Sequence, residues 1–167
     1  MLARRYKQFW FALADAALAE GKGALSGSSG PTSARLDVPL VRSFIARITE
    51  LVGVGQPDIR YAASVAAFEM GRALLGKVVG LGEKLAVAER QKAAASGKRA
   101  DALAKDIASL KTVIAEMEEL VTGPIFSVVF MHRYRDSNEV VRAMCVEYLA
   151  AAVVVRPQVF LCDKYLK

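Results

Sequence analysis

One stretch of 38 residues, 58–95, contains no strong helix breaker, and it constrains the fold more than any other part of the sequence. Pro57 stands at its start, where the missing backbone N–H costs nothing, and the next strong break is Ser96-Gly97. A helix of this length measures about 57 Å at 1.5 Å per residue. Since that exceeds the core of a domain of 167 residues, we expect the far half to project. Three glycines weaken this helix by about 1 kcal/mol each relative to alanine without ending it; they are Gly71, Gly76 and Gly80.

The segment after Ser96-Gly97 returns with apolar residues spaced alternately by four and three positions, which is a heptad seam. The residues of this seam are Leu103, Ile107, Leu110, Ile114, Met117 and Val121. Their expected partners on the outgoing helix are Val78, Leu81, Leu85 and Ala88. The two segments together predict a long antiparallel helical hairpin over about residues 58–122. Its tip lies near Ser96-Gly97, and Gly123-Pro124 ends it.

Residues 130–149 predict the end of one helix, a tight polar turn and the start of a second helix. Asp136, Ser137 and Asn138 all carry side-chain oxygens that cap helices or hold turns. We expect Arg142, on the first turn of the second helix, to bond to Asp136 or to a turn carbonyl, as in corners that pin neighbouring HEAT-type hairpins together. An ordinary corner in a helical bundle fits equally well. The second helix has an apolar stripe at helical spacing: Val140, Val141, Met144, Cys145, Tyr148 and Leu149.

A similar sequence pattern occurs earlier in the chain. Residues 56–60 open a helix with Ile59-Arg60 as residues 138–142 do with Val141-Arg142, and small or apolar residues follow both pairs. Two copies favour stacked helix pairs over a single closed bundle. We therefore predict an all-α fold, an α-solenoid fragment of HEAT-like hairpins with one long projecting hairpin.

The rest of the chain gives further helices. Residues 3–20 predict an amphipathic helix, 21–37 a mobile Gly/Ser-rich loop, and 38–52 a helix stopped by Gly53 and Gly55. Residues 125–134 predict a new apolar helix, and the helix after the turn should run to Val155 and stop at Arg156-Pro157. The expected buried face of the first helix is Tyr6, Phe9, Trp10, Leu13, Ala17 and Leu18, and that of the second is Val41, Phe44, Ile45, Ile48 and Leu51.

Composition excludes several classes of protein. A hydrophobic fraction of 54% excludes disorder for most of the chain, and no apolar run is long enough to span a bilayer. The basic start resembles a signal peptide, but Trp10, Asp15 and Glu20 interrupt its apolar run. Cys145 and Cys162 lack partners at metal-ligand spacing, which favours buried thiols in an intracellular, soluble protein.

No set of residues indicates catalysis. His132 is the single histidine, and its expected role is that of a polar helix-end residue rather than a base or ligand. Arg133 and Arg135 beside it are expected to be solvated or paired with acids. The sequence holds no nucleophile elbow, phosphate loop or paired carboxylates, so we predict no enzyme, no cofactor, no metal and no small-molecule substrate.

The hairpin is the candidate partner-binding feature. From Lys77 to Lys111 it carries eight basic and four acidic residues, which is +4 of the chain's net charge of +6. Between Arg90 and Arg99 there are four bases and no acid. A protruding cationic tip suits contact with a phosphate backbone, although a solvated helical surface is also commonly rich in lysine and arginine. The candidate DNA-contact residues are Lys98, Arg99, Arg90, Lys92 and Lys105.

Three segments resemble the start of the stromalin conserved domain, which belongs to the stromal antigen family of cohesin subunits. They are Val129-Phe130-Met131-His132-Arg133-Tyr134-Arg135-Asp136, then Val141-Arg142-Ala143-Met144-Cys145-Val146-Glu147, and Phe160-Leu161-Cys162-Asp163-Lys164-Tyr165-Leu166-Lys167. Gly97-Lys98-Arg99-Ala100 also matches a segment near the tip of the family's long hairpin. The resemblance is weakest over residues 1–37.

The resemblance implies a hook-shaped HEAT-repeat subunit, located in the nucleus on chromosomes. Such a subunit would bind the kleisin subunit of the cohesin ring, contact DNA and chromatin, and support sister chromatid cohesion, with no catalytic activity. It divides the chain into an N-terminal helical region, residues 1–122, and the start of the stromalin conserved domain, residues 124–167. Because Tyr165 and Leu166 would have no following helix to pack on, we expect a fragment of a longer protein. The alternative is a general α-solenoid adaptor without a nucleic-acid role.

Overall fold

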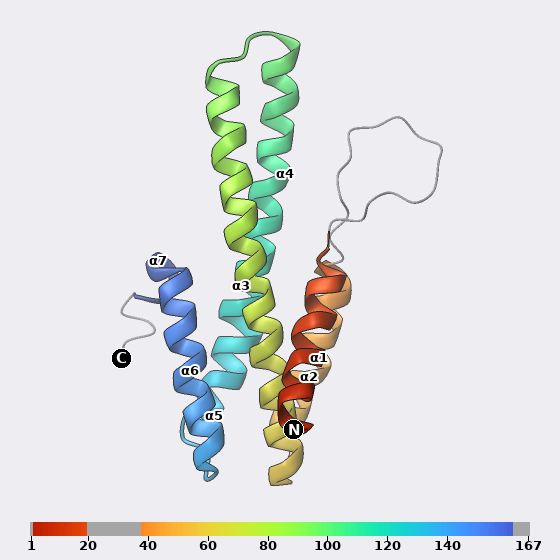
Figure 1. Ribbon diagram of the computed structural model, residues 1–167, viewed down its shortest axis with the longest axis vertical. Coiled ribbons are helices and arrows are strands. Elements are labelled where there is room, and N and C mark those ends of the chain that lie inside the picture. Colours follow the sequence, from red (N-terminus) through yellow and green to blue (C-terminus); the bar gives the residue numbers. More distant parts are fainter. Residues whose placement is uncertain (1, 20–37, 162–167) are drawn as a thin grey trace, which may run out of the picture.

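The computed structural model describes residues 2–19 and 38–161, and all regular structure in these ranges is helical (Figure 1). The predicted all-α class is therefore confirmed. The elements are α1 (Leu2–Ala17), α2 (Val38–Val52), α3 (Pro57–Ala93), α4 (Lys98–Leu120), the π-helical segment η1 (Val121–Phe130), α5 (Met131–Arg133), α6 (Glu139–Val155) and α7 (Pro157–Phe160).

The helices stack as antiparallel pairs (Figure 1). The first pair is α2 with α3. The second pairs the continuous helix of α4, η1 and α5 with α6, and the turns of both pairs lie at the same end of the molecule. α3 packs beside α6, α2 packs beside η1, and α1 packs on α3. This side-by-side stacking is the solenoid-like arrangement that the two sequence copies predict.

The long hairpin projects from the stacked body as predicted (Figure 1). Its outgoing helix, α3, lies within two residues of the predicted bounds at each end. Buried side chains on α3 run from Ala63 to Leu81, and the 12 residues beyond Leu81 contain none. On the returning helix Ile107 is the last buried side chain towards the tip. Gly97, at φ +60°, reverses the chain before α4, a backbone conformation that suits glycine.

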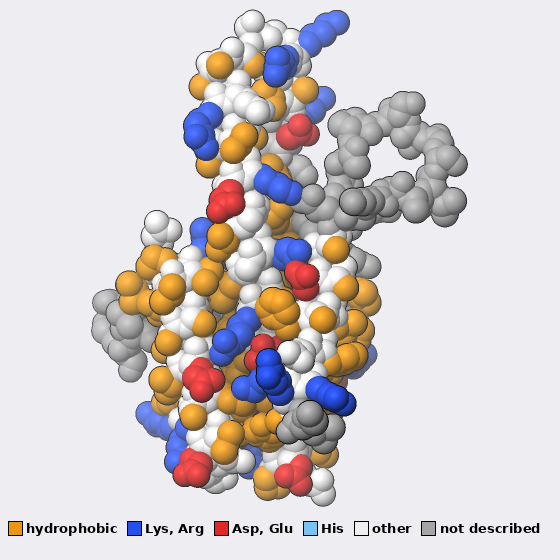
Figure 2. Space-filling view, in the orientation of Figure 1, with side chains coloured by type: hydrophobic (Ala, Val, Ile, Leu, Met, Phe, Trp, Pro, Cys, Tyr) orange, Lys and Arg blue, Asp and Glu red, His pale blue; other side chains and the backbone are white. Residues whose placement is uncertain are grey.

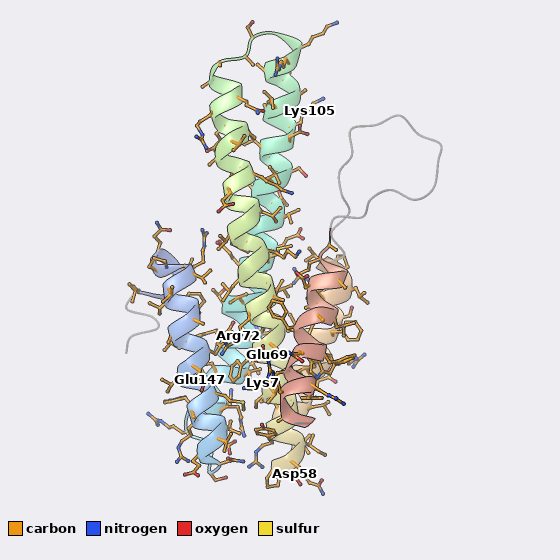
Figure 3. The ribbon with its side chains drawn as sticks, viewed as in Figure 1. Lys7, Asp58, Glu69, Arg72, Lys105 and Glu147 are labelled. Atoms are coloured by element: carbon orange, nitrogen blue, oxygen red, sulfur yellow. The ribbon has the colours of Figure 1, made fainter. Side chains whose placement is uncertain are left out.

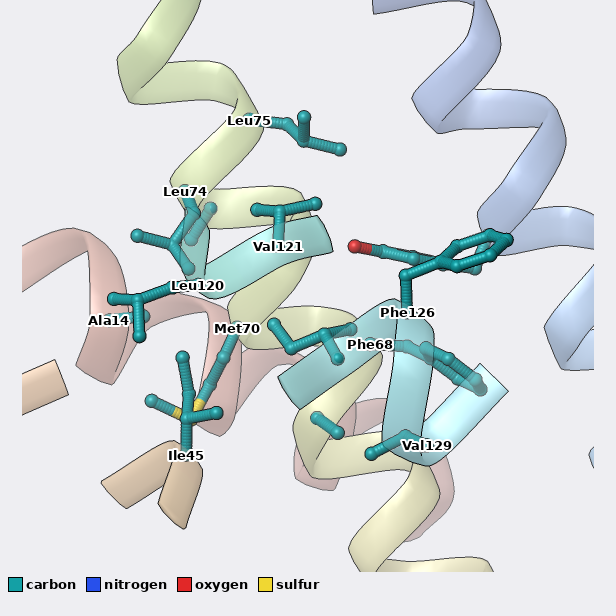
Figure 4. Packing of buried hydrophobic residues seen from close by; sticks show 14 of the residues in the cluster. Ala14, Ile45, Phe68, Met70, Leu74, Leu75, Leu120, Val121, Phe126 and Val129 are labelled. Atoms are coloured by element: carbon teal, nitrogen blue, oxygen red, sulfur yellow. The ribbon is translucent and has the colours of Figure 1, made fainter. Parts of the chain in front are cut away.

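The core is one cluster of buried side chains around α3, to which α1, α2, η1 and α6 contribute, and Figure 4 shows part of its packing. Phe126 of η1 stacks on Phe130 with ring centroids 4.5 Å apart, and Tyr148 of α6 stacks on Phe68 of α3 at 4.8 Å. Tyr148 is fully buried and lies against Gly71. The missing side chain of Gly71 therefore allows α6 to approach α3 closely.

The predicted helix break at Gly123-Pro124 is wrong, because Pro124 lies inside a continuous helix. Proline removes an i→i−4 hydrogen bond and its ring crowds the preceding turn of an α-helix. The wider π-helical winding of η1 relieves this conflict, and the Ser127 hydroxyl donates to the Thr122 carbonyl at 2.8 Å. Most apolar residues of η1 are buried, and η1 packs on α2 and α3, so tertiary packing overrides the local signal.

The expected buried faces are also wrong in part. Phe9 on α1 is 56% exposed and Leu51 on α2 is 47% exposed, while Ala14 on α1 and Val52 on α2 are buried. Val140 on α6 is likewise exposed. Each helix contacts the body along a narrower strip than its apolar stripe, because successive residues point about 100° apart. The bounds of α2 and the stop of α6 at Arg156-Pro157 are as predicted.

Some predictions fall outside the described residues: the mobile loop 21–37, Cys162, and the exposed pair Tyr165 and Leu166. Within the described ranges, no helix is long and apolar enough to cross a membrane.

Candidate functional site

The corner between α5 and α6 is organised around the buried carboxylate of Asp136, whose side chain is 1% exposed. One carboxylate oxygen, Oδ2, accepts from Arg133 Nη1 at 2.6 Å and from Arg60 Nε at 3.3 Å. The other, Oδ1, accepts from the Asn138 backbone at 2.9 Å and from the Ser137 hydroxyl at 3.4 Å. Arg60 belongs to α3, so this carboxylate joins the two helix pairs.

These contacts set the protonation of Asp136. Burial alone raises the pKa of the carboxyl, but the hydrogen bonds from Asn138, Arg60 and Arg133 outweigh burial, and the pKa lies below its ordinary value of 3.8. The charged form is therefore held across the neutral range.

Arg142 bonds to turn carbonyls rather than to the Asp136 carboxylate. Its Nη1 donates to the carbonyl oxygen of Asp136 at 2.7 Å and to that of Ser137 at 3.1 Å. Arg60 makes the equivalent contact in the first pair, where its Nη1 donates to the Gly55 carbonyl at 2.6 Å. The two arginines matched in the sequence thus hold the same kind of turn, and Arg60 alone of the two also reaches the neighbouring pair.

The other residues of the corner have structural partners. His132 is exposed, and its Nδ1 lies 2.6 Å from the Val128 carbonyl oxygen. Tyr134 stacks on Phe130 with ring centroids 5.9 Å apart, and the Arg135 guanidinium lies 4.8 Å from the centre of the Tyr134 ring. Arg133 is bound to Asp136. The corner can hold helices together, and its groups are already occupied with one another.

The buried thiol next to this corner is not a reactive group. Burial, followed by the nearby Asp136 charge, raises the pKa of Cys145 to about 12. A thiol with such a pKa stays protonated near neutrality, and the thiolate is the nucleophile and metal ligand. No group of three or more histidine, cysteine or acidic residues within 2–19 and 38–161 could hold a metal ion.

Charged side chains from α1, α3 and α6 gather on the face of the body seen in Figure 3. Glu69 and Arg72 of α3 lie 4.0 Å apart between Lys7 of α1 and Glu147 of α6. Burial raises the pKa of Glu69, Arg72 and Lys7 oppose this shift, and Glu147 adds to it. The ion pair of this cluster lies within α3, and the charges of α1 and α6 act on it from either side.

The candidate DNA-contact residues lie together at the hairpin tip. Arg90 and Lys92 are on the last turn of α3, Lys98 and Arg99 are on the first turn of α4, and Lys105 follows about 10 Å further along α4. Figure 2 shows Lys and Arg side chains at this end of the molecule, and Figure 3 labels Lys105 there. All five are exposed.

The tip differs from the base of the hairpin in how its charges are paired. Nearer the body, Lys77 pairs with Asp15 at 2.9 Å and Lys111 pairs with Glu89 at 2.8 Å. The five candidate cations make no ion pair with any residue that the structure describes; Arg90 only donates to the Ala86 carbonyl. Residues 90–106 carry five bases and two acids, a net charge of +3 on an exposed tip.

Two joining contacts could not be identified from the sequence. Arg60 was matched to Arg142 by its position, but nothing in the sequence assigned it an acidic partner 76 residues away. Arg156, expected only as part of a helix stop, forms an ion pair with Glu118 and ties the end of α6 to α4. Both contacts depend on stacking of the pairs, which local sequence signals do not specify.

Comparison of the sequence with those of known proteins identifies relatives. No protein-family model matches the chain. It is 29% identical over 113 residues to "Sister-chromatid cohesion protein 3" of Arabidopsis thaliana, which is 65% of this chain and 10% of that protein. It is 26% identical over 140 residues to "Cohesin subunit scc-3" of Caenorhabditis elegans, which is 78% of this chain and 13% of that protein. The chain thus spans about a tenth of the length of these relatives. These two similarities confirm the resemblance to cohesin subunits of the stromal antigen family that the sequence indicates.

Proposed function

We propose that the chain is part of a non-catalytic cohesin subunit that supports sister chromatid cohesion in the nucleus. In this role it would bind the kleisin subunit of the cohesin ring and contact DNA through its hairpin. The names of the two relatives support the cohesin context. The helix pairs support a scaffold role, because their polar corner groups are occupied in joining one pair to the next.

The unpaired positive charge of the hairpin tip is the observation that carries the DNA contact. Five exposed cations lie on the two helix ends near the tip, and α3 extends about 18 Å beyond Leu81, its last buried residue. Flexible lysines and arginines of this kind neutralise phosphates, and such contacts position a protein without reading bases. The proposed contact is therefore independent of DNA sequence.

A binding titration with a non-specific DNA duplex tests this contact. The logarithm of affinity should fall linearly with the logarithm of salt concentration, by about 0.9 for each phosphate neutralised. The double variant Lys98→Glu with Arg99→Glu should bind more weakly and reduce this slope by about 2. Arg4→Glu with Arg5→Glu makes the same change in net charge on exposed positions of α1 and should retain more binding. Equal binding by the tip variant and the parent chain would overturn the DNA contact.

Kleisin binding is tested separately. A kleisin subunit should co-purify with a full-length version of the protein that carries this chain, and the tip variant of that version should be captured equally well. Failure to capture kleisin, with DNA binding intact, would remove kleisin from the proposal and leave the DNA contact in place.

A general adaptor without a nucleic-acid role is the second candidate. The apolar surface of α6 favours it, because Val146 is 67% exposed and Val154 is 81% exposed. Apolar side chains this open on one helix suit contact with another protein. The same titration separates the two candidates, since an adaptor would show no salt-dependent binding to duplex DNA.

A further inference from the structure

Ser96 stands at the most distal part of the hairpin. It belongs to the connector of residues 94–97, between the end of α3 and the start of α4, and its side chain is exposed. Its hydroxyl makes no hydrogen bond to any residue in the described ranges. Figure 1 shows this connector at the far end of the hairpin from the body. The body of the molecule therefore does not obstruct the access of an enzyme to Ser96.

The residues around Ser96 are basic on both sides. Arg90 and Lys92 precede it by six and four positions, and Lys98 and Arg99 follow it by two and three. No acidic residue lies between Glu89 and Asp101. Protein kinases that select basic substrates carry acidic residues near their active site, so a serine flanked by cations and free of acids is a complementary substrate.

We propose that Ser96 is a phosphorylation site for a basophilic serine/threonine protein kinase, and that its phosphorylation weakens the hairpin's contact with DNA. In the reaction the Ser96 Oγ attacks the γ-phosphorus of ATP. A new Oγ–P bond forms, the bond from that phosphorus to the β-phosphate oxygen breaks, and ADP leaves. The hydroxyl proton passes to the base of the kinase.

The hairpin tip can adopt the extended conformation that kinases bind. The connector is already non-helical, and the adjoining turns of α3 and α4 bury no side chain. Residues 89–94 are all exposed, and the nearest buried side chains are Leu81 and Ile107. Helix ends that bury little surface unfold locally at low cost. Residues 92–99 can therefore open without disturbing the core.

The expected effect on DNA binding follows from charge, and this part of the inference rests on the proposed function. A phosphoserine adds about −1.5 to −2 charge near neutral pH. The net charge of residues 90–106 is +3, so most of the excess disappears. Lys92, Lys98 and Arg99 can then pair with the phosphoserine instead of with DNA phosphates.

The test uses the full chain, a basophilic kinase with ATP, and mass spectrometry to locate the phosphate. We expect stoichiometric modification at Ser96 in the parent chain and none at this position in Ser96→Ala. DNA affinity should fall about tenfold at low salt after phosphorylation, with a salt slope smaller by about 2. Ser109→Asp places a negative charge on an exposed position of α4 about 17 Å below the helix start, and serves as the control. It should reduce affinity less than Ser96→Asp does.

The outcomes separate this inference from the proposed function. A kinase that leaves Ser96 unmodified while phosphorylating a standard basic peptide would overturn the inference, and DNA binding by the unmodified chain would still stand. Modification at Ser96 without loss of affinity would also overturn it. If the unmodified chain binds no DNA, the proposed function fails first, whatever the kinase does.

Discussion

At the scale of single residues, glycines on the same helix have opposite roles. A methyl group added at Gly71 would lie 2.5 Å from the Tyr148 hydroxyl oxygen, whereas one added at Gly76 would meet nothing within 4 Å. Gly71→Ala should therefore lower the free energy of unfolding by about 1–3 kcal/mol through overpacking. Gly76→Ala should raise it by about 1 kcal/mol through helix propensity. Urea unfolding of both variants measures the difference, and equal effects would show that α6 does not rest on Gly71.

Asp136 gives the stability of the corner a pH dependence. Because the pKa of the carboxyl is lower in the folded chain than its ordinary value of 3.8, the unfolded chain binds more protons in acid. The contribution of Asp136 is therefore present above this value and is lost as the pH falls through and below it. Asp136→Asn should cost about 2 kcal/mol near pH 7 and much less near pH 2, measured by urea unfolding at each pH. A cost that stays constant with pH would contradict the charged network.

Arg142 tests the turn itself. Arg142→Ala removes the two hydrogen bonds to the carbonyls of Asp136 and Ser137 and should lower the free energy of unfolding by about 1–3 kcal/mol. Arg47→Ala is the matched control, because Arg47 pairs with Glu50 on the surface and its side chain is 79% exposed. The control should change stability by about 0.5 kcal/mol or less. If both variants behave alike, the turn is held by packing rather than by Arg142.

At the scale of elements, the sequence predicted the positions of the helices well, and their packing and ionic contacts less well. The long span after Pro57 and the heptad seam after Gly97 are local signals for the two helices of the hairpin. Both helices are present as expected. The continuous helix through Pro124 was missed because burial of η1 between α2 and α3 compensates for a local breaker. The sequence alone was enough to predict that the candidate cations lie together at the tip. Their lack of ionic partners within the described ranges required the structure.

The hairpin should also differ along its length in local stability. The buried side chains of α3 all lie between Ala63 and Leu81, while the part nearer the tip has only solvent-facing or partly buried side chains. Amide hydrogens of residues 85–93 and 98–104 should therefore exchange faster than those of residues 66–78, because they open without loss of core packing. Hydrogen exchange followed by mass spectrometry measures this. Uniform protection along α3 would show that the hairpin opens only with the whole molecule.

At the scale of the whole molecule, the joining contacts form a chain across the stacked pairs. Asp136 ties α3 to the corner of the second pair, and Glu118 ties α4 to the end of α6. α6 in turn has one face on α3 and another open to solvent. The open face has alanines between valines, including Val140, Val146 and Val154. This face also carries the exposed charges of Arg142 and Glu147, but its valines leave apolar surface open to a second partner.

This open face predicts concentration-dependent self-association of the isolated 167-residue chain. Burying valines removes apolar surface from water at about 25 cal/mol per Å², so copies of the chain should associate through α6 as concentration rises. Val146→Glu with Val154→Lys should shift the chain towards monomer without lowering its stability, because both side chains are more than half exposed. Val79→Glu, at a valine of α3 that is 39% exposed, is the control and should leave association unchanged. Sedimentation velocity over a range of concentrations decides the matter: a parent chain that stays monomeric throughout would mean that the α6 surface is too small or too mobile to hold a partner of its own kind.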